Sequence, residues 1–500
     1  MSTGCISLPS DFEQVPGATW QYPEQTRLGK FFEGYAPEDP ELSGVYLLSD
    51  PRAAFHARFG FAGLAEKTLD LQYYLWKGDL TGRLLLYRAL QAADRGVKVR
   101  ILIDDIYHSG RDDIYAAIAL HPGVDIRIYN PTGYRGIAKN ISIVFHKRTL
   151  DHRMHNKIFL VDGVVAVLGG RNIGDDYFEI DPELNFRDID VLTVGPAARD
   201  AGAAFDEYWN GPAAVPINVL VKESVPAAEL DTLRQELESA LNNIDTVPYT
   251  VPVTPDETIK VLEELAEDFV WAKAEIVVDS LERFHGRTES AFVKLANRLA
   301  QETEHDMVIQ TAYLIPSRAG VARMEAMTER GVRIRILTNS LESNNHISVH
   351  SHYMKWRKPM LKAGIELYEL RPDPEMLDYF KEQNSRIADS HAGLHTKAFV
   401  VDGRFSMIGS YNMDPRSRIW NSEIGLLVDS KEFASRVLDV MEEDFDPVNS
   451  YRVSLRSGHK LTWSAKESDG SQNWNHDPGS SRGLRFLLRI MSWIPFGKEL

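Results

Sequence analysis

Met154-His155-Asn156-Lys157-Ile158-Phe159-Leu160-Val161-Asp162-Gly163 and Leu394-His395-Thr396-Lys397-Ala398-Phe399-Val400-Val401-Asp402-Gly403 are two versions of one motif. The four apolar residues after each lysine are typical of a strand buried on both faces. Side chains two apart on a strand point the same way, so each histidine and its lysine should face one opening. Asp162 and Asp402 close the two motifs and are candidate site residues with the histidines and lysines, but they should lie at the far strand ends and make structural hydrogen bonds.

These residue types suit chemistry on a phosphate. Histidine can act as a nucleophile or general acid near neutral pH, and lysine can hold a phosphate oxygen. Gly169-Gly170-Arg171-Asn172 follows the first motif, and Gly409-Ser410-Tyr411-Asn412 follows the second at the same offset. The amides of Asn172 and Asn412 can donate to phosphate oxygens, and Ser410 joins them as a candidate binding or orienting residue. Two lysines and two asparagines across a pseudo-twofold axis would form one anion clamp, for which we expect neither metal nor cofactor.

Two acidic residues are candidates for orienting the histidines. A nucleophilic histidine needs a carboxylate that fixes its tautomer and stabilises its developing charge. Asp188 follows His155 by 33 residues, and Glu423 follows His395 by 28 residues, at the matching place in the other copy. We therefore assign Asp188 and Glu423 as the orienting partners.

The repeat extends beyond the motifs. Arg95-Gly96-Val97-Lys98-Val99-Arg100-Ile101-Leu102 recurs as Arg330-Gly331-Val332-Arg333-Ile334-Arg335-Ile336-Leu337. In both copies an apolar run and an amphipathic helical stretch precede it, which is the pattern of a β-α-β unit. The chain should therefore divide into an N-terminal segment (1–45), a first α/β half (46–215), a linker with its own helix (216–275), a second half (276–446) and a C-terminal tail with an amphipathic helix (447–500).

Composition narrows the class of partner. The formal net charge is −16 over 500 residues, which argues against a general nucleic-acid binder because such a protein usually carries a basic face. The single cysteine, Cys5, excludes an intramolecular disulfide. No run of about 18 apolar residues occurs, so no transmembrane helix is expected.

The duplicated His-Lys-Asp motif resembles the phospholipase D superfamily, and the chain is most similar to the third bacterial type of cardiolipin synthase, type C. Stretches that carry this resemblance include Leu71-Gln72-Tyr73-Tyr74-Leu75-Trp76, Lys355-Trp356-Arg357-Lys358 and Asp414-Pro415-Arg416-Ser417. The resemblance implies two α/β/α sandwiches related by a pseudo-twofold axis, with the active site at their interface. It implies a phosphatidyl-histidine intermediate, with His155 as nucleophile and His395 as acid and base. It also implies phosphatidylglycerol and phosphatidylethanolamine as substrates for cardiolipin synthesis.

The chain ends suggest how it meets a membrane. A helix from Ser481 would place Leu484, Leu487, Leu488, Met491 and Ile494 on one face and Arg482, Arg485 and Arg489 on the other, with Trp493 and Phe496 at its end. This pattern suits an interfacial helix on anionic lipid, or else a helix docked on the protein body. Thr3-Gly4-Cys5 resembles the end of a lipoprotein cleavage site, whereas relatives commonly begin with a longer hydrophobic segment. We expect a peripheral protein of the bacterial inner membrane, on either side of it.

Three alternatives stay open. The same site could use water and act as a phospholipase D hydrolase that releases phosphatidic acid. The superfamily also contains nucleases, which the acidic charge disfavours. A lipid-binding protein on an inactive scaffold is the third alternative, which the intact histidines and lysines disfavour. A small helper protein encoded elsewhere would leave no signal in this sequence.

Overall fold

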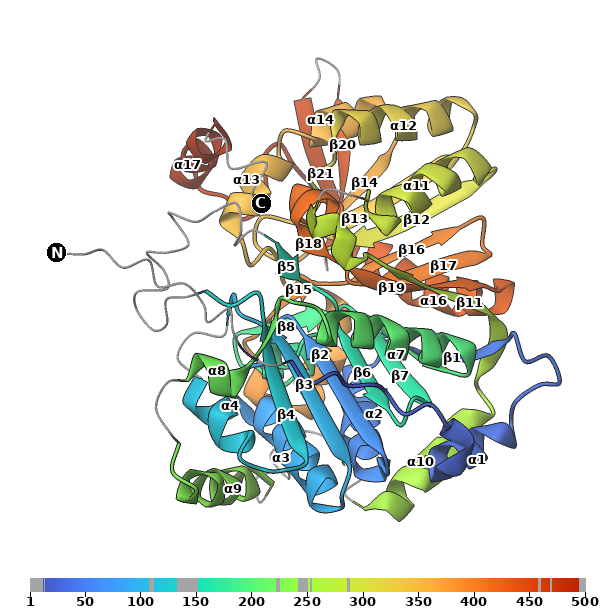
Figure 1. Ribbon diagram of the computed structural model, residues 1–500. Helices are drawn as coiled ribbons and strands as arrows, with labels where there is room; N and C mark the ends of the chain where they lie inside the picture. Colours follow the sequence, from blue (N-terminus) through green and yellow to red (C-terminus); the bar gives the residue numbers. More distant parts are fainter. Residues whose placement is uncertain are drawn as a thin grey trace.

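The computed structural model describes residues 12, 14–107, 112–132, 152–221, 225–241, 251, 254–285, 288–456, 460–467 and 470–493. Cys5 lies outside these residues. The chain forms two α/β halves, with the N-terminal half below and the C-terminal half above in Figure 1. This is the mixed α/β architecture with an internal repeat that the sequence predicts.

The first half is built on one mixed sheet. Its order is β10 (Ala214–Pro216), β4 (Val124–Tyr129), β3 (Lys98–Asp104), β2 (Thr68–Tyr73), β6 (Ile158–Val161), β7 (Val165–Gly169), β9 (Asp190–Val194) and β1 (Ser43–Leu48). The pairs of β2 with β3 and of β3 with β4 are parallel, and the others are antiparallel. The motif strand β6 therefore lies in the centre of the sheet.

The second half repeats this order. Its strands are β20 (Ser450–Arg456), β14 (Glu366–Leu370), β13 (Arg333–Asn339), β12 (Asp306–Thr311), β16 (Lys397–Val401), β17 (Phe405–Gly409), β19 (Ile424–Asp429) and β11 (Val270–Val278). The first residues of β11 also pair with β1, which joins the two sheets. The second motif strand, β16, takes the place of β6.

Helices cover both faces of each sheet. The outer face of the first sheet packs against α2 (Pro51–Leu64), α3 (Leu80–Asp94) and α4 (Asp112–Ile118). The outer face of the second packs against α11 (Ala291–Glu302), α12 (Arg318–Glu329) and α14 (Arg357–Lys362). Between the halves, α7 (Pro196–Trp209) and α16 (Lys431–Phe445) share one apolar core with strands of both sheets (Figure 1). Burial of this core stabilises the contact between the halves.

Shorter elements complete the chain. The further helices and strands are α1 (Arg27–Glu33), α8 (Ile217–Leu220), α9 (Ala228–Leu241), α10 (Pro255–Ala266), α13 (Ile347–Tyr353), α15 (Asp378–Gln383), α17 (Arg482–Trp493), β21 (Lys460–Glu467) and β22 (Gly470–Trp474). One-turn 3₁₀ helices lie at Pro23–Gln25, Asp175–Tyr177, Leu281–His285, Glu375–Leu377 and Ser385–Ile387, and a π turn at Arg416–Trp420. No helix among the described residues is long and apolar enough to cross a membrane.

The two segments outside the repeat hold more structure than expected. The linker contains α8, α9 and α10, and it also contains the start of β11. The tail begins with β20, β21 and β22, which extend the second sheet beyond β14. Tyr451 and Val453 on β20, with Trp463 and Ala465 on β21, point inward at alternate positions and are buried.

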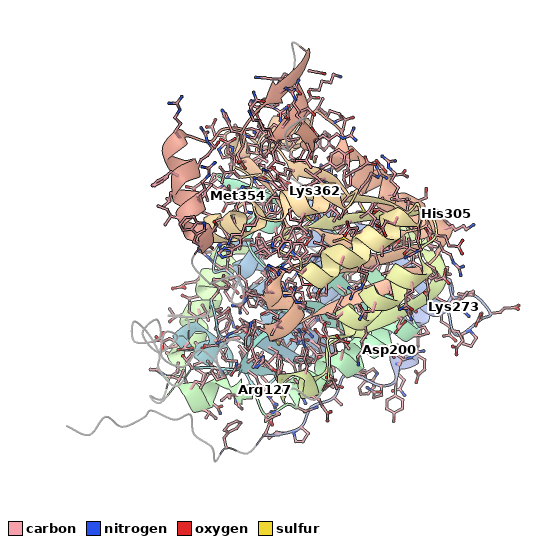
Figure 2. The ribbon with its side chains drawn as sticks, turned by 90° about the horizontal axis from the view of Figure 1, so that it is seen from above. Arg127, Asp200, Lys273, His305, Met354 and Lys362 are labelled. Atoms are coloured by element: carbon pink, nitrogen blue, oxygen red, sulfur yellow. The ribbon has the colours of Figure 1, made fainter. Side chains whose placement is uncertain are left out.

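Helix α17 packs on the body through part of its surface. It lies beside α13, next to Met354 at the edge of the molecule (Figure 2). Leu488 is fully buried there, whereas Phe486, Leu487, Ile490 and Trp493 are exposed. The apolar residues expected on one face of the helix therefore lie in two environments. Leu488 packs against the protein body, whereas Leu487 lies among the exposed apolar residues. Ile494 and Phe496 lie outside the described residues.

Short strands interlock the two halves. β5 (Arg153–Met154), directly before His155, pairs in parallel with β18 (Asn421–Ser422) of the other half. β15 (His391–Leu394), directly before His395, pairs in parallel with β8 (Leu184–Arg187). The backbone N–H groups of His155 and His395 continue these pairings, donating to the carbonyl oxygens of Ser422 and Arg187 at 3.0 and 2.8 Å. Each motif histidine is therefore held by a strand of the opposite half.

Candidate active site

The motif aspartates form hairpin corners away from the histidines. Asp162 and Gly163 have φ angles of 54° and 64°, and they connect β6 to β7. Asp-Gly suits this turn because both central residues need positive φ. The Asp162 carboxylate accepts backbone N–H groups of residues 66–68 at 2.7 to 3.3 Å, and Asp402 accepts those of residues 304–306. Both aspartates therefore fix the start of a neighbouring strand, as the alternation predicts, and contact neither histidine.

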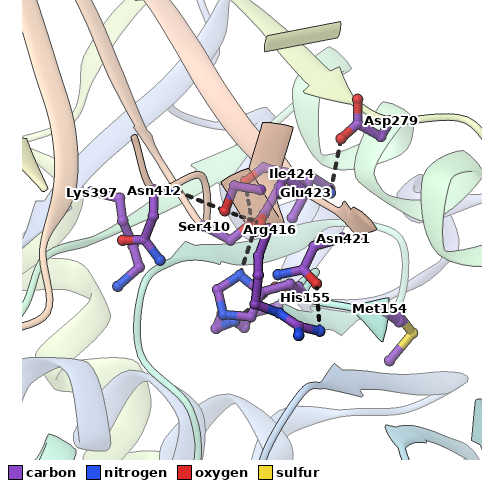
Figure 3. A network of polar contacts seen from close by, with 12 residues as sticks. Met154, His155, Asp279, Lys397, Ser410, Asn412, Arg416, Asn421, Glu423 and Ile424 are labelled. Atoms are coloured by element: carbon purple, nitrogen blue, oxygen red, sulfur yellow. Dashed lines mark hydrogen bonds and ion pairs between the residues drawn. The ribbon is translucent and has the colours of Figure 1, made fainter. Parts of the chain in front are cut away.

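His155 is held by a carboxylate network from the second half. Its Nδ1 lies 2.7 Å from Oε2 of Glu423, a fully buried side chain (Figure 3). Ser410 and Ser417 donate to the two oxygens of that carboxylate at 2.5 and 2.6 Å. Ser410 thus orients Glu423. An ionised Glu423 places the proton on Nδ1 and leaves Nε2 with its lone pair available.

His395 is held in the same way by the first half. Its Nδ1 lies 2.6 Å from Oδ2 of Asp188, and Oδ1 of the same carboxylate accepts the backbone N–H of Ile189 at 2.9 Å. Gly170 takes the place of Ser410 here, and a Cβ at this glycine would come within 2.2 Å of the Asp188 carboxylate. The absence of a side chain at Gly170 therefore lets Asp188 occupy this position.

The carboxylates are exchanged between the halves. Counted along the chain, Asp188 follows His155 and Glu423 follows His395, but each carboxylate binds the histidine of the other copy. The cause is the strand pairing described above. β18 ends beside His155 just before Glu423, and β8 ends beside His395 just before Asp188. Each histidine and its carboxylate partner therefore come from different halves.

The motif lysines lie beside the histidines. Lys157 Nζ donates to the carbonyl oxygen of His155 at 2.7 Å, and Lys397 Nζ donates to that of His395 at 2.5 Å. Both side chains are buried, and this lowers the pKa of Lys157 to about 7 and that of Lys397 to about 8. Two buried ammonium groups raise the affinity of the site for an anion, because a bound phosphate would compensate their charge.

The surroundings of both motif histidines favour the neutral imidazole ring. Burial lowers the pKa of His155 and of His395 well below the ordinary value, and the charges of both lysines lower each pKa further. Burial also raises the pKa of Asp188 to about 6. The charge of each lysine lowers the pKa of both histidines, so the two lysines and the two histidines are electrostatically coupled across the halves.

The two asparagines differ in their contacts. Asn172 donates to the Tyr177 hydroxyl at 2.8 Å and accepts the backbone N–H of Leu75 at 3.2 Å, so the protein fixes its amide. The side-chain carbonyl of Asn412 is buried and has no hydrogen-bond partner within the described residues. Buried polar groups are normally paired, so the Asn412 carbonyl oxygen is an acceptor that a hydrogen-bond donor of a ligand can pair with.

Several residues of the site were not predicted from their own chemistry. Ser417 appears in the sequence analysis only within a family stretch, yet it binds Glu423. Tyr74 packs edge-on against His155 with ring centroids 4.7 Å apart, and Tyr177 packs likewise against His395 at 5.2 Å. Aromatic residues that pack against a site in this way follow no fixed spacing along the chain, so the sequence alone does not identify them. Within the part of the chain that the structure describes, no three His, Cys, Asp or Glu side chains are grouped to hold a metal ion.

Comparison with known proteins agrees with this geometry. The family model described as "Cardiolipin synthase, PLD-like domain" matches residues 62–209 and 297–445, which is more than half of the chain. Cardiolipin synthase C of Escherichia coli (strain K12) is 34% identical over 469 residues, covering 92% of this chain and 96% of that protein. Cardiolipin synthase A of Pseudomonas entomophila (strain L48) is 27% identical over 421 residues, covering 83% and 72%.

A solved structure has the same fold. Phosphatidylserine synthase of Haemophilus influenzae Rd KW20 superposes with a TM-score of 0.57 at 13% identity, covering 95% of this chain and all of that one. The family model matches each half separately, in the regions that carry the two motifs. The chain therefore belongs to the cardiolipin synthase family of PLD-like proteins, within the phospholipase D superfamily, and is an enzyme of the transferase type.

Proposed function

We propose that this enzyme makes cardiolipin from phosphatidylglycerol and a second phospholipid, phosphatidylethanolamine or phosphatidylglycerol, through a phosphatidyl-histidine intermediate. The observation that carries the proposal is the exchanged pair of contacts, His155 with Glu423 and His395 with Asp188, beside two buried lysines. This arrangement supplies a nucleophile, a proton carrier and an anion clamp at one place.

In the first step His155 Nε2 attacks phosphorus. A P–N bond forms while the P–O bond to the head-group alcohol breaks. His395 gives its Nε2 proton to the leaving oxygen, so that glycerol or ethanolamine departs. Glu423 stabilises the positive charge that develops on the His155 ring, and Lys157 and Lys397 bind the phosphate oxygens.

In the second step the acceptor is the head-group hydroxyl of phosphatidylglycerol. Neutral His395 takes its proton, the oxygen attacks phosphorus, and the P–N bond breaks to restore His155. The product contains two phosphatidyl groups on one glycerol. His395 must be protonated before the first step, and the bound phosphate anion favours this by compensating the lysine charges that otherwise oppose it.

Water in place of the lipid hydroxyl would release phosphatidic acid by the same two steps. We favour transfer because the family model and the relatives above carry the name cardiolipin synthase. The alternative uses the same residues and differs only in the acceptor. The two reactions are therefore distinguished by their products.

We also propose that α17 brings the enzyme to an anionic lipid surface. Phe486, Leu487, Ile490 and Trp493 are exposed at spacings that place them on one side of the helix, and Trp493 is 85% exposed. Arg482 and Arg489 are exposed on the same helix, where they can bind lipid phosphates. An acidic protein of net charge −16 needs such a local basic and apolar surface to bind anionic lipid.

The experiment is product analysis by mass spectrometry. Purified protein is incubated with phosphatidylglycerol, with and without phosphatidylethanolamine, and with no other protein. We expect cardiolipin, with release of glycerol or ethanolamine that identifies the donor. Phosphatidic acid as the sole product would support the hydrolase instead. Turnover only after addition of a cell extract would indicate a helper protein.

A further inference from the structure

The second half contains an apolar cavity next to the motif lysine. The cavity has a volume of about 360 Å³ and lies under α11 and α12, against β12, β16 and β17. This volume is within the usual range for ligand pockets, about 300 to 1,000 Å³. Its apolar lining includes Phe292, Met307, Met324, Met327, Phe399 and Met407, and its polar end includes Lys397 and Asp414.

Strand alternation explains how the cavity reaches the site. Lys397 and Phe399 are two apart on β16, so both side chains are on the face that α11 and α12 cover. Gly409, at the end of the neighbouring strand β17, lines the cavity together with Lys397. A phosphate held by Lys397 would therefore have the cavity directly beside it.

In the first half, side chains fill the space that corresponds to this cavity. The two halves can be aligned by their matching strand pairs, because Leu71 pairs with Phe159 in the first half and Ile309 pairs with Phe399 in the second. Helices α2 and α11 also correspond, since each ends four residues before the first residue of the next strand. This register places Arg58 at the position of Ala296, and Tyr73 at the position of Thr311.

In the first half these positions form a buried network. Arg58 donates to the Tyr73 hydroxyl at 3.1 Å and to Asp190 at 2.8 Å, and all three side chains are buried. In the second half Ala296 and Thr311 are small, and both line the cavity. Gly425 stands where Asp190 stands in the repeat. The cavity therefore takes the place of a side-chain network that the second copy lacks.

The apolar packing of the two halves differs accordingly. Residues under α2 and α3 belong to one continuous cluster, whereas those under α11 and α12 fall into two separate clusters. Phe292 on α11 stacks on Tyr411 with ring centroids 4.9 Å apart and planes 6° apart, which forms one wall of the opening. Methionine side chains along the cavity are flexible and adapt to an irregular apolar ligand.

We infer that this cavity binds an acyl chain of the phospholipid whose phosphate is held at Lys397. The inference rests on the proposed function, because that function makes a phospholipid the substrate. The occupant follows from the chemistry of the lining, which is mostly apolar and includes the lysine of the phosphate site, with Arg323 and Arg418 as its other cationic residues. A diacyl phospholipid matches this arrangement, because its charged phosphate would lie at Lys397 and an apolar acyl chain would lie along the cavity.

The test measures affinity against chain length. The His155→Ala enzyme, which prevents turnover, is titrated by calorimetry with monomeric dibutyroyl, dihexanoyl and dioctanoyl phosphatidylglycerol. Affinity should rise roughly fourfold for each methylene group that enters the cavity. Equal affinity for all three lipids would overturn the inference.

A matched pair of variants locates the effect. Ala296 and Ala326 are both exposed helix alanines, and only Ala296 lines the cavity. Added to His155→Ala, Ala296→Trp should remove most of the rise with chain length, whereas Ala326→Trp should keep it. Both should bind glycerophosphoglycerol, which has no acyl chain, with equal affinity. The same rise in both variants would contradict the assignment.

The outcomes separate this inference from the proposed function. A chain-length dependence that Ala296→Trp removes, in an enzyme that makes no cardiolipin, would support the cavity and reject the proposed reaction. Cardiolipin synthesis by the unmodified enzyme, together with a flat affinity series, would reject the cavity and keep the reaction.

Discussion

The exchange of carboxylates between the halves predicts which variants behave alike. We use a phosphatidyl ester of p-nitrophenol, whose leaving group departs without a proton. A variant that loses general acid catalysis should be slow on phosphatidylglycerol but nearly normal in the first turnover of the nitrophenyl ester. His395→Ala and Asp188→Asn should both show this rescue. His155→Ala and Glu423→Gln should be slow on both substrates.

The size of the Glu423→Gln effect follows from the contact. Two unit charges about 4 Å apart interact by about 4 kcal/mol at an effective dielectric constant of about 20. A charge-assisted hydrogen bond exceeds a neutral one by about 1–2 kcal/mol. The Coulomb energy and the hydrogen-bond energy describe the same contact between His155 and Glu423, so they are not added. We expect Glu423→Gln to remove about 2–4 kcal/mol of stabilisation when His155 develops its positive charge, which makes the first step roughly 30- to 900-fold slower. The Michaelis constant should change little, because Glu423 binds the histidine and not the lipid.

The assay is stopped-flow release of p-nitrophenolate beside quenched-flow transfer from phosphatidylglycerol. Glu443→Gln is the matched control, because Glu443 is an exposed carboxylate that pairs with Arg187 at 2.6 Å outside the site. The control should retain normal rates. If Asp188→Asn instead follows His155→Ala on both substrates, the carboxylates act within their own copies and the reasoning is refuted.

Three further predictions concern the lysines, the pH dependence and the membrane. Lys157→Ala and Lys397→Ala should each cost about 2–5 kcal/mol in kcat/KM, measured on monomeric lipid, because phosphate charge is left uncompensated; losses below threefold would count against the clamp. The profile of kcat/KM against pH should fall below about pH 6 as Asp188 gains a proton, and fall again above pH 7 to 8 as Lys157 (pKa about 7) and Lys397 (about 8) lose theirs; a flat profile from pH 5 to 9 would contradict these assignments. The double variant Phe486→Ala, Trp493→Ala should bind phosphatidylglycerol vesicles roughly tenfold or more weakly in a sedimentation assay and should keep its activity on monomeric lipid. Unchanged vesicle binding would show that another part of the protein contacts the membrane.

The repeat and the motif side chains could be predicted because they depend on local pattern. Strand alternation places His155 and Lys157 together and Asp162 at a hairpin corner, and the structure has these features. The exchange of Asp188 and Glu423 could not be predicted, because a symmetric repeat allows pairing within a copy or between copies. Only the cross-pairing of short strands beside each histidine decides it.

Other features depend on long-range packing. Strands β20 and β21 have inward side chains at alternate positions, but nothing local shows that β20 joins β14. The cavity arises from the small residues Ala296 and Thr311, and small residues are not a signal until the structure shows which space they leave. The ends of the five predicted segments and the individual catalytic roles stay predictions.

The most direct test of the central claim is intact-protein mass spectrometry within milliseconds of mixing with phosphatidylglycerol, after an alkaline quench that preserves phosphohistidine. The account predicts an added mass of one phosphatidyl group, located on the peptide that contains His155. In the His395→Ala enzyme the adduct formed from the p-nitrophenyl ester should persist, because no base activates the acceptor. An unmodified protein under conditions of rapid turnover, or an adduct on any residue other than the two motif histidines, would contradict the covalent mechanism.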